Sequence, residues 1–236
     1  MSVHPIEQES YRILEERIDL TGLAPLGRAV VARVAHATAD LDLARSMVLD
    51  EAELEMAVRA LRDGAPVVAD VVMVAAGITG RRARSFLDQV PTGVPATSAA
   101  TSGVAGVPAT GAATSGLAGV PATSAVTSGV AGVPATRSAA AMRLAAAAHP
   151  SGAVFVVGCA PTALVELVDL AAAGAVEPAL VIGVPVGFVG AAESKAALRA
   201  SGLPAVSNVG ERGGSAAAAA ACNALIRAAA IGGDRG

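Results

Sequence analysis

The sequence lacks the residues on which nucleic-acid binding usually depends. Its 236 residues include no Trp, one Tyr and three Phe, so a surface of aromatic rings that stacks on bases is not expected. Lys195 is the single lysine, the net charge is -3, and the basic residues are scattered. A cationic surface that follows a phosphate backbone is therefore missing as well, and we expect no nucleic-acid partner.

Cysteine is scarce too, because only Cys159 and Cys222 occur. Two cysteines are too few for a disulfide framework, and their apolar surroundings predict reduced, buried thiols. No Cys and His spacing suits zinc, so no metal site is expected. The amino-terminal segment mixes acidic and basic residues without an apolar core, and acidic residues and prolines interrupt the apolar run 153–190. We expect a cytoplasmic protein with no membrane-spanning segment.

What the sequence does contain is an internal repeat. A 13-residue unit recurs with valines at positions 94, 107, 120 and 133, and it consists of small residues, Pro and Gly. Such units bury little apolar surface to offset the entropy of ordering. We predict a single domain formed by residues 1–88 and 137–236, interrupted by a low-complexity insertion over 89–136 that forms a mobile loop. A short solenoid of stacked turns is the alternative.

The rest of the chain has the periodicity of a layered α/β protein. Helical spacing over 7–18, 26–37 and 50–64 predicts three helices before any strand. An apolar run over 67–74 predicts a buried strand. Beyond the repeat, helices are expected at 137–147, 161–173, 191–200 and 213–230, and strands at 153–157, 179–184 and 205–209. This alternation predicts a three-layer α/β fold, with a mostly parallel sheet, helices on both faces and a helical N-terminal segment.

Ligands of such folds bind beyond the carboxyl ends of the strands. Here those ends carry Asp70 and the glycine-rich turns 158–162, 183–190 and 210–215. Their spacing matches neither the dinucleotide fingerprint nor the phosphate-binding loop, so we interpret the glycines as tight turns and sites of close packing. The backbone N–H groups of these turns remain candidates for binding carboxylates.

His36 is the histidine with the clearest chemical setting. It ends the second predicted helix, and Arg33 lies one turn earlier on the same face. An imidazole is a versatile proton donor near neutral pH, but a half-buried structural histidine fits the same pattern, and both readings stay open. Arg33 and Arg137 are candidates for holding carboxylates.

Seven segments together resemble the precorrin-8X methylmutase family, which consists of isomerases of cobalamin biosynthesis. They are HPIEQESYRILEE, RVAHATAD, DGAPVVADVVMVAAGIT, TRSAAAM, CAPTAL, PALVIGVPVGFVGAAESK and GGSAAAAAACNAL. The resemblance implies a homodimer that moves a methyl group from C-11 to C-12 of precorrin-8X, giving hydrogenobyrinate or its cobalt form without an added cofactor. It also implies that His36 is catalytic, and that Ser10, Arg33, Thr79 and Arg137 line the tetrapyrrole site.

The sequence also departs from the family pattern. Cys159 follows Gly158 where the family usually has G-N-A-P-T, and residues 209–212 differ from its R-G-R-x-G-G-S motif. After Gly80 the usual loop and strand are expected to be replaced by residues 81–88 and the repeat. Two other functions remain open from the sequence: a non-catalytic carrier of tetrapyrroles in the same pathway, and an interaction protein whose repeat is the functional part.

Overall fold

A computed structural model of the protein describes residues 4–92 and 136–231. Most of the predicted insertion, and with it the choice between a mobile loop and a solenoid, lies outside the described residues. The strands are β1 (Met47–Leu49), β2 (Val67–Ala69), β3 (Ala83–Ser85), β4 (Val154–Val157), β5 (Leu180–Gly183) and β6 (Ala205–Asn208). The helices are α1 (Pro5–Arg17), α2 (Pro25–Thr38), α3 (Leu41–Arg45), α4 (Glu51–Arg62), α5 (Val72–Gly77), the 3-10 turn η1 (Leu87–Gln89), α6 (Arg137–Ala148), α7 (Pro161–Ala172), α8 (Ala191–Ala200) and α9 (Ser215–Ile231).

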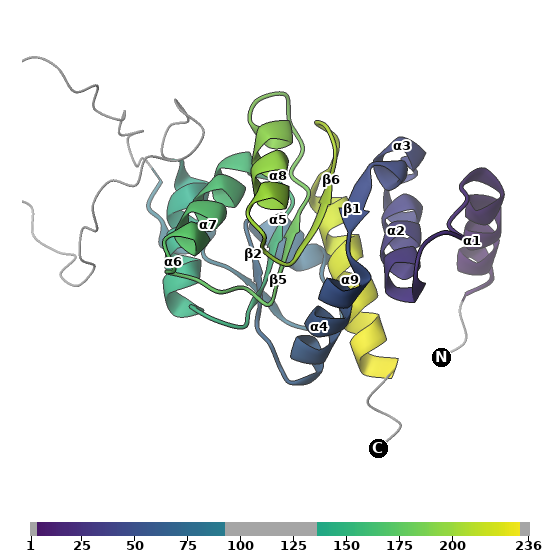
Figure 1. Ribbon diagram of the computed structural model, residues 1–236, viewed down its shortest axis with the longest axis horizontal. Coiled ribbons are helices and arrows are strands. Elements are labelled where there is room, and N and C mark those ends of the chain that lie inside the picture. Colours follow the sequence, from purple (N-terminus) through teal and green to yellow (C-terminus); the bar gives the residue numbers. More distant parts are fainter. Residues whose placement is uncertain (1–3, 93–135, 232–236) are drawn as a thin grey trace, which may run out of the picture.

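The strands form one six-stranded sheet in the order β1-β6-β5-β4-β2-β3. All neighbouring strands are parallel except β1, which pairs with β6 in the antiparallel sense. Because parallel strands need crossover connections, helices cover both faces of the sheet, and Figure 1 shows them on either side of the central strands. The predicted three-layer α/β fold with a mostly parallel sheet is confirmed.

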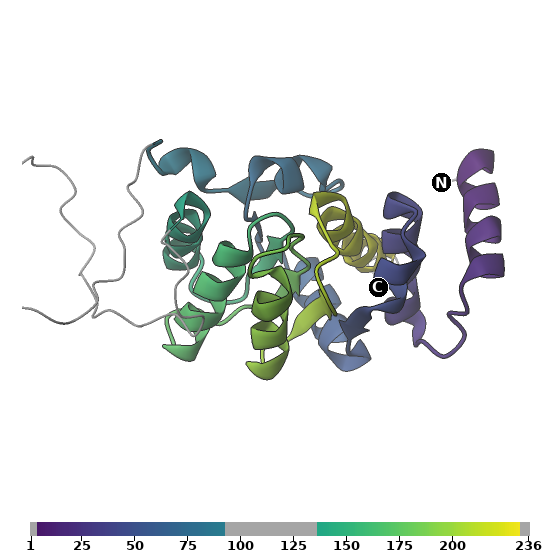
Figure 2. The same ribbon diagram turned by 90° about the horizontal axis from the view of Figure 1, so that it is seen from above.

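Alternate residues of each strand build two separate cores. Val67, Val154 and Leu180 pack with helices α2, α4, α5 and α9 on one face. Val68 and Phe155 pack with α6, α7 and α8 on the other face. The period of two along a strand explains this division, because successive side chains point to opposite faces. In Figure 2, α1 and α2 lie together at one end of the molecule and α6 lies at the other.

Helix α2 is anchored at its first turn by a residue from another helix. Its N-cap residue, Ala24, offers no side-chain acceptor. The Glu51 carboxylate takes that place, accepting hydrogen bonds of 2.8 Å from each of the N–H groups of Leu26 and Gly27. A carboxylate at a helix N-terminus is stabilised both by these bonds and by the helix dipole. Helix α4 thereby fixes the position of α2, which carries Arg33 and His36.

Two strands and one cysteine correct the sequence-based expectations. The expectation that the helix over 50–64 precedes every strand is wrong, because the short helix α3 and the strand β1 lie between α2 and α4. The expected loss of the strand after Gly80 is wrong as well, because β3 pairs with β2. Both are three-residue edge strands, too short to show the alternation that identifies longer ones. Cys222 is buried as expected, whereas Cys159 is exposed, since it lies in the turn that follows β4.

Candidate active site

The described residues place an imidazole between two side chains of α1. The Ser10 hydroxyl lies 2.8 Å from Nδ1 of His36 in a partly buried hydrogen bond. The Tyr11 ring stacks on the imidazole, with the ring centroids 4.9 Å apart and the planes inclined by 11°. Ser10 thus engages Nδ1, and Nε2 is the other ring nitrogen. Two successive residues of α1 therefore fix the plane of the His36 ring and the partner of its Nδ1.

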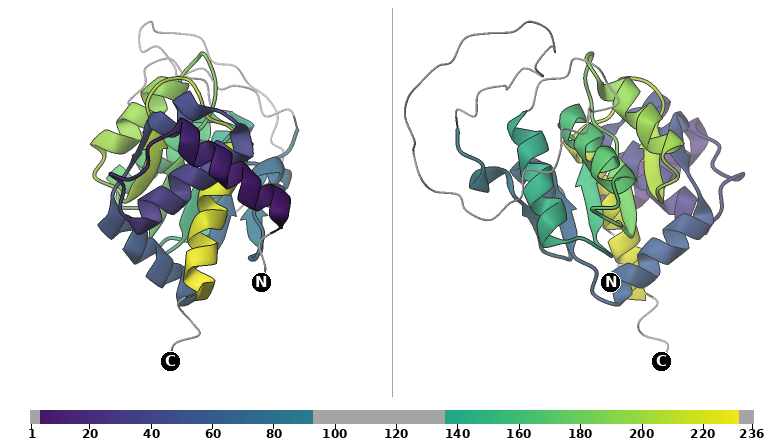
Figure 3. Two further views of the ribbon diagram at one scale, coloured as in Figure 1. Left: turned by 90° about the vertical axis from the view of Figure 1, so that its right-hand side faces the viewer. Right: turned by 60° about the vertical axis from the view of Figure 1, so that its left-hand side comes forward.

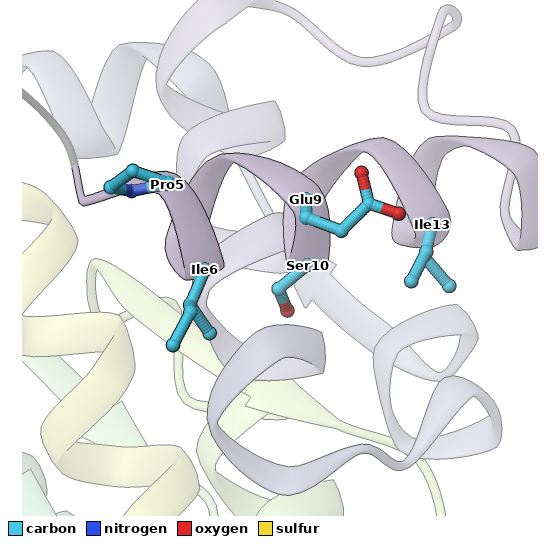
Figure 4. Close-up of a pocket in the computed structure, with 5 residues that line it drawn as sticks. All are labelled: Pro5, Ile6, Glu9, Ser10 and Ile13. Carbon is cyan, nitrogen blue, oxygen red and sulfur yellow. The ribbon is translucent and has the colours of Figure 1, made fainter.

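A cavity of about 470 Å³ opens beside this hydrogen bond. It is lined by one side of α1, namely Pro5, Ile6, Glu9, Ser10 and Ile13. In Figure 4 the side chains of Ile6, Ser10 and Ile13 leave the helix in the same direction. Ile6 is 74% exposed, so this side of α1 presents apolar surface around the hydroxyl. This lining suits contact with an apolar face of a ligand, with the Ser10 hydroxyl as a polar group beside it.

Arg33 reaches the same helix from the preceding turn of α2. Its Nη1 donates a hydrogen bond of 3.0 Å to Oε1 of Glu7, and one of 3.4 Å to the Tyr11 hydroxyl. The Tyr11 hydrogen bond is the main cause that raises the pKa of Arg33 above its usual value, with the Glu7 charge adding to it. Arg33 therefore stays charged, and it ties Tyr11 to the position at which the ring stacks on His36.

Thr79 is connected to this cluster by a contact with α9, and not by a contact with α2. The Thr79 N–H donates a hydrogen bond of 2.7 Å to Oδ1 of Asn223, and the Asn223 amide donates one of 2.9 Å to the Gly77 carbonyl. One turn further along α9, Nη1 of Arg227 lies 3.8 Å from Oε1 of Glu7. Helix α9 therefore connects the exposed Thr79 to the α1–α2 pair.

Arg137 is the predicted site residue that the structure keeps apart from the others. It begins α6, on the sheet face opposite to α2 and α9. Its guanidinium donates hydrogen bonds of 2.9 Å to the Val90 carbonyl and 2.8 Å to the Leu87 carbonyl. The structure thus brings Ser10, Arg33 and His36 together, with Thr79 nearby. Arg137 instead binds backbone carbonyls on the other side of the sheet.

The glycine-rich turn 158–162 does bind a carboxylate, but that carboxylate belongs to the chain itself. Asp70 accepts hydrogen bonds of 2.8 Å from each of the N–H groups of Cys159 and Ala160, together with longer ones from Val71 and Gly158. Burial raises the pKa of Asp70, against the opposing effect of these backbone bonds. The turn therefore joins the carboxyl ends of β2 and β4, and its N–H groups are already occupied.

The turn after β6 is held by the single lysine. Nζ of the buried Lys195 donates to Oδ1 of Asn208 at 3.1 Å and to the Arg212 carbonyl at 2.6 Å. Burial, with a smaller effect from the charge of Arg199, lowers the pKa of Lys195 to about 8. The Arg212 guanidinium in turn pairs with Asp40 at 2.7 Å, directly after the helix that carries His36. The glycine-rich turn 210–215 is therefore also held by contacts within the protein.

Four residues of this cluster were not predicted from the sequence, namely Glu7, Tyr11, Asn223 and Arg227. Three of them lie inside segments that carry the family resemblance, so position alone could have suggested them. Their roles depend on which faces of α1, α2 and α9 meet, which a single sequence does not show. Within the two described ranges, no group of three His, Cys, Asp or Glu side chains could hold a metal ion. No helix in the same ranges is long and apolar enough to cross a membrane.

Comparison with known families identifies what kind of protein carries this arrangement. The family model described as precorrin-8X methylmutase matches residues 5–129 and again residues 122–228. The chain belongs to the precorrin-8X methylmutase family. Both matches include residues 122–129, which lie inside the 13-residue repeat.

Individual methylmutases are similar over nearly their whole length. The cobalt-precorrin-8 methylmutase of Methanothermobacter thermautotrophicus is 34% identical over 225 residues, which cover 94% of this chain and 92% of the relative. The precorrin-8X methylmutase of Sinorhizobium sp is 35% identical over 225 residues, covering 94% and 93%. A crystal structure of the precorrin-8X methylmutase from Thermus thermophilus superposes with a TM-score of 0.71 at 30% identity, covering 98% of this chain and 100% of that one.

Proposed function

We propose that this protein is an isomerase of cobalamin biosynthesis that moves a methyl group from C-11 to C-12 of precorrin-8X, giving hydrogenobyrinate or its cobalt form. The observation that carries the proposal is the His36 imidazole. Its Nδ1 is bound by Ser10, its ring is stacked on Tyr11, and it lies in a chain of the methylmutase family. One of the relatives is named for a substrate that contains cobalt and the other for a substrate without it. Their sequence identities to this chain are 34% and 35%. Both substrates therefore belong in the assay.

In the proposed reaction, the protein itself forms no covalent bond with the substrate. A [1,5]-sigmatropic shift breaks one carbon–methyl bond and forms another within the same molecule, without a change of oxidation state and without a covalent enzyme intermediate. The protein has to position the macrocycle and bias its protonation and electron distribution. We propose no added cofactor for this step, because one proton donor next to a ring nitrogen supplies what the shift needs.

His36 acts as that donor in this proposal. When the imidazole is protonated, both ring nitrogens carry a proton, and the Ser10 hydroxyl accepts from Nδ1. When Nε2 has donated its proton to the substrate, the neutral ring keeps its proton on Nδ1, and the same hydroxyl still accepts it. Ser10 therefore holds the ring in one orientation before and after proton transfer. A carboxylate in the same place would favour only the charged form.

In this proposal, the remaining predicted residues bind the carboxylates at the periphery of the substrate. A tetrapyrrole with acetate and propionate side chains needs guanidinium and hydroxyl groups around its rim. Arg33, Thr79 and Arg137 are proposed for this role, and Ser10 contributes through His36. Support for Arg33 is its position one turn before His36 on α2, and support for Thr79 is its bond to Asn223 of α9, a helix that shares a core with α2. Arg137 stays a prediction from the family resemblance.

We further propose that the protein acts in the cytoplasm as a homodimer. Support comes from apolar side chains that the single chain leaves open at the carboxyl edge of the sheet. Phe188 is 92% exposed, and Val186 and Val189 are 48% and 85% exposed in the same turn. Exposed apolar groups that cluster in this way usually mark an interface. Light scattering coupled to size-exclusion chromatography of the parent and of Phe188→Asp tests the dimer, which the aspartate should weaken.

The test of the function is turnover by the parent and by a histidine variant. Anaerobic incubation with precorrin-8X should produce the orange product, followed by its absorbance. We expect His36→Gln to lower kcat by about 10²–10⁴, the usual worth of general acid–base catalysis, while product binding is retained. His149→Gln is the matched control, since His149 lies at the end of α6 on the other face. Parental turnover by His36→Gln, or binding without turnover by the parent, would refute the proposal.

A further inference from the structure

Two arginines share one carboxylate at the edge of the candidate active site. Oε1 of Glu7 lies 3.0 Å from Nη1 of Arg33 and 3.8 Å from Nη1 of Arg227. Two guanidinium groups and a single carboxylate leave one positive charge uncompensated within this triplet. The three residues come from α1, α2 and α9, so the charge is assembled only by the folded protein. Among the residues that the structure describes, no second carboxylate pairs with these two arginines.

The two arginines differ in how far they are engaged. Arg33 is 32% exposed and donates hydrogen bonds to both Glu7 and the Tyr11 hydroxyl. Arg227 is 57% exposed, and its 3.8 Å contact with Glu7 is too long for a hydrogen bond. Arg33 therefore holds the site together, whereas the donors of Arg227 are available for an acceptor from outside the chain.

The position of Arg227 joins two parts of the candidate site. Asn223 lies one turn earlier on the same face of α9, where its side chain holds the Thr79 N–H at 2.7 Å. On the other side, Glu7 links Arg227 to Arg33, which precedes His36 by one turn of α2. Figure 3 shows α9 beside the α1–α2 pair in both views. Arg227 is thus linked to Thr79 through Asn223 and to Arg33 through Glu7.

We infer that Arg227 is a further substrate-binding residue, whose guanidinium holds a peripheral carboxylate of the tetrapyrrole between Thr79 and the Glu7–Arg33 pair. This inference rests on the proposed function and adds a residue to it. A guanidinium binds a carboxylate through two parallel N–H donors, which fixes the orientation of a ligand as well as its charge. Arg33 positions Glu7 and Tyr11 in this arrangement, in addition to the contact with the substrate rim that is proposed for it.

A structural role is the alternative for Arg227. It lies just before the last turn of α9, near the end of the helix at which a cation interacts favourably with the dipole. That role requires a charge but no particular geometry, so Arg227→Lys should preserve it. A bidentate contact with a carboxylate is lost in both Arg227→Lys and Arg227→Gln. The two variants therefore separate the roles when binding and stability are measured side by side.

The experiment compares these variants with Arg143→Gln. Arg143 is a matched control, because it is 55% exposed, pairs with Glu166, and belongs to α6 on the opposite face of the sheet. KM and kcat are measured with precorrin-8X, the Kd of hydrogenobyrinate by absorbance titration, and stability by urea unfolding. We expect Arg227→Gln to raise KM and Kd roughly tenfold with kcat nearly unchanged, as for a contact made equally in ground and transition states.

The outcomes distinguish this inference from the proposed function. Arg227→Lys should weaken binding nearly as much as Arg227→Gln while keeping parental stability, and Arg143→Gln should behave as the parent. Parental KM and Kd in Arg227→Gln would overturn the inference, while leaving the isomerase proposal standing if the parent turns over. A parent that neither converts precorrin-8X nor binds hydrogenobyrinate would overturn the proposed function and this inference together.

Discussion

We propose that Ser10, which the family resemblance places in the tetrapyrrole site, acts through His36. Its hydroxyl is 2.8 Å from Nδ1 of His36, so the partner that it has in the folded protein is the imidazole. A residue that sets the tautomer of a histidine acts on the chemical step, whereas a residue that binds a carboxylate acts on affinity. The two roles predict different kinetic signatures.

We expect Ser10→Ala to lower kcat by roughly tenfold, the cost of one hydrogen bond, with a smaller change in KM. The ring would lose its fixed orientation, although Tyr11 still stacks on it. The decisive measurement is the same substitution in a His36→Gln background. If Ser10 acts through His36, it should cause almost no further loss there, because the two residues work as a unit. A fully additive loss would instead support direct contact between Ser10 and the substrate.

Much of this site can be reached from the sequence, and the remainder depends on helix packing. The spacing of Arg33 and His36 on one face of a helix is a local property, so it is predictable. The partners of these two residues are not. Glu7 and Tyr11 belong to a separate helix, and which of its faces meets α2 is decided by tertiary contacts. The remote position of Arg137 is likewise a property of the sheet, because α6 and α2 cover opposite faces.

The length of a helix or strand decides whether it can be predicted from the sequence. The long helices α2, α6 and α8 and the buried strands β4 and β5 lie where their periodicity predicts them. The three-residue edge strands β1 and β3 were missed, since they bury few side chains and show no clear alternation. Missing them changed the number of strands but not the class of fold, because both add to the edges of a sheet whose centre was predicted.

The turn between β6 and α9 depends on one buried amine, and this gives a test by pH. The pKa of Lys195 is lowered from 10.5 to about 8, chiefly by burial. Between these two values the unfolded chain binds the proton and the folded protein does not. The free energy of unfolding should therefore rise with pH across this window, by at most about 1.4 kcal/mol per pH unit. Below about pH 8 this contribution is absent.

Lys195→Met removes the titrating group while keeping a side chain of similar length. Because other groups titrate equally in both proteins, we expect the difference in unfolding free energy, parent minus variant, to increase from about pH 8 to about pH 10.5. Urea unfolding below, within and above the window measures it. A difference that stays constant across all three conditions would show that the amine has an ordinary pKa in the folded protein.

For the molecule as a whole, the described structure shows how an insertion is tolerated at this place. Strand β2 precedes the repeat and β4 follows it, yet the two pair directly in the parallel sense. Arg137, just after the insertion, donates to the carbonyls of Leu87, just before it, and of Val90, at its start. Both ends are therefore fixed together by the core and by one guanidinium. We accordingly propose a single domain that continues across the insertion.

The length of the repeat should matter little for folding. The free-energy cost of closing a loop grows only with the logarithm of its length, so removing residues 94–119, two of the 13-residue units, should change the free energy of unfolding by roughly 1 kcal/mol, in the stabilising direction. The deletion keeps the third unit and leaves the bonds of Arg137 untouched. Urea unfolding and turnover of precorrin-8X by the deletion variant and the parent check this expectation. Lost turnover with intact folding would make the repeat part of the active protein.

Proteolysis tests the predicted mobile loop directly. The segment 94–136 contains no Lys or Arg, so trypsin cannot report on it, whereas its many Ala and Val residues suit elastase. If the units bury too little apolar surface to order themselves, elastase should cut there before it cuts anywhere in the sheet or the helices. The two fragments should stay associated, because β2 and β4 pair across the cut. A segment that resists elastase as long as the core does would favour the solenoid of stacked turns.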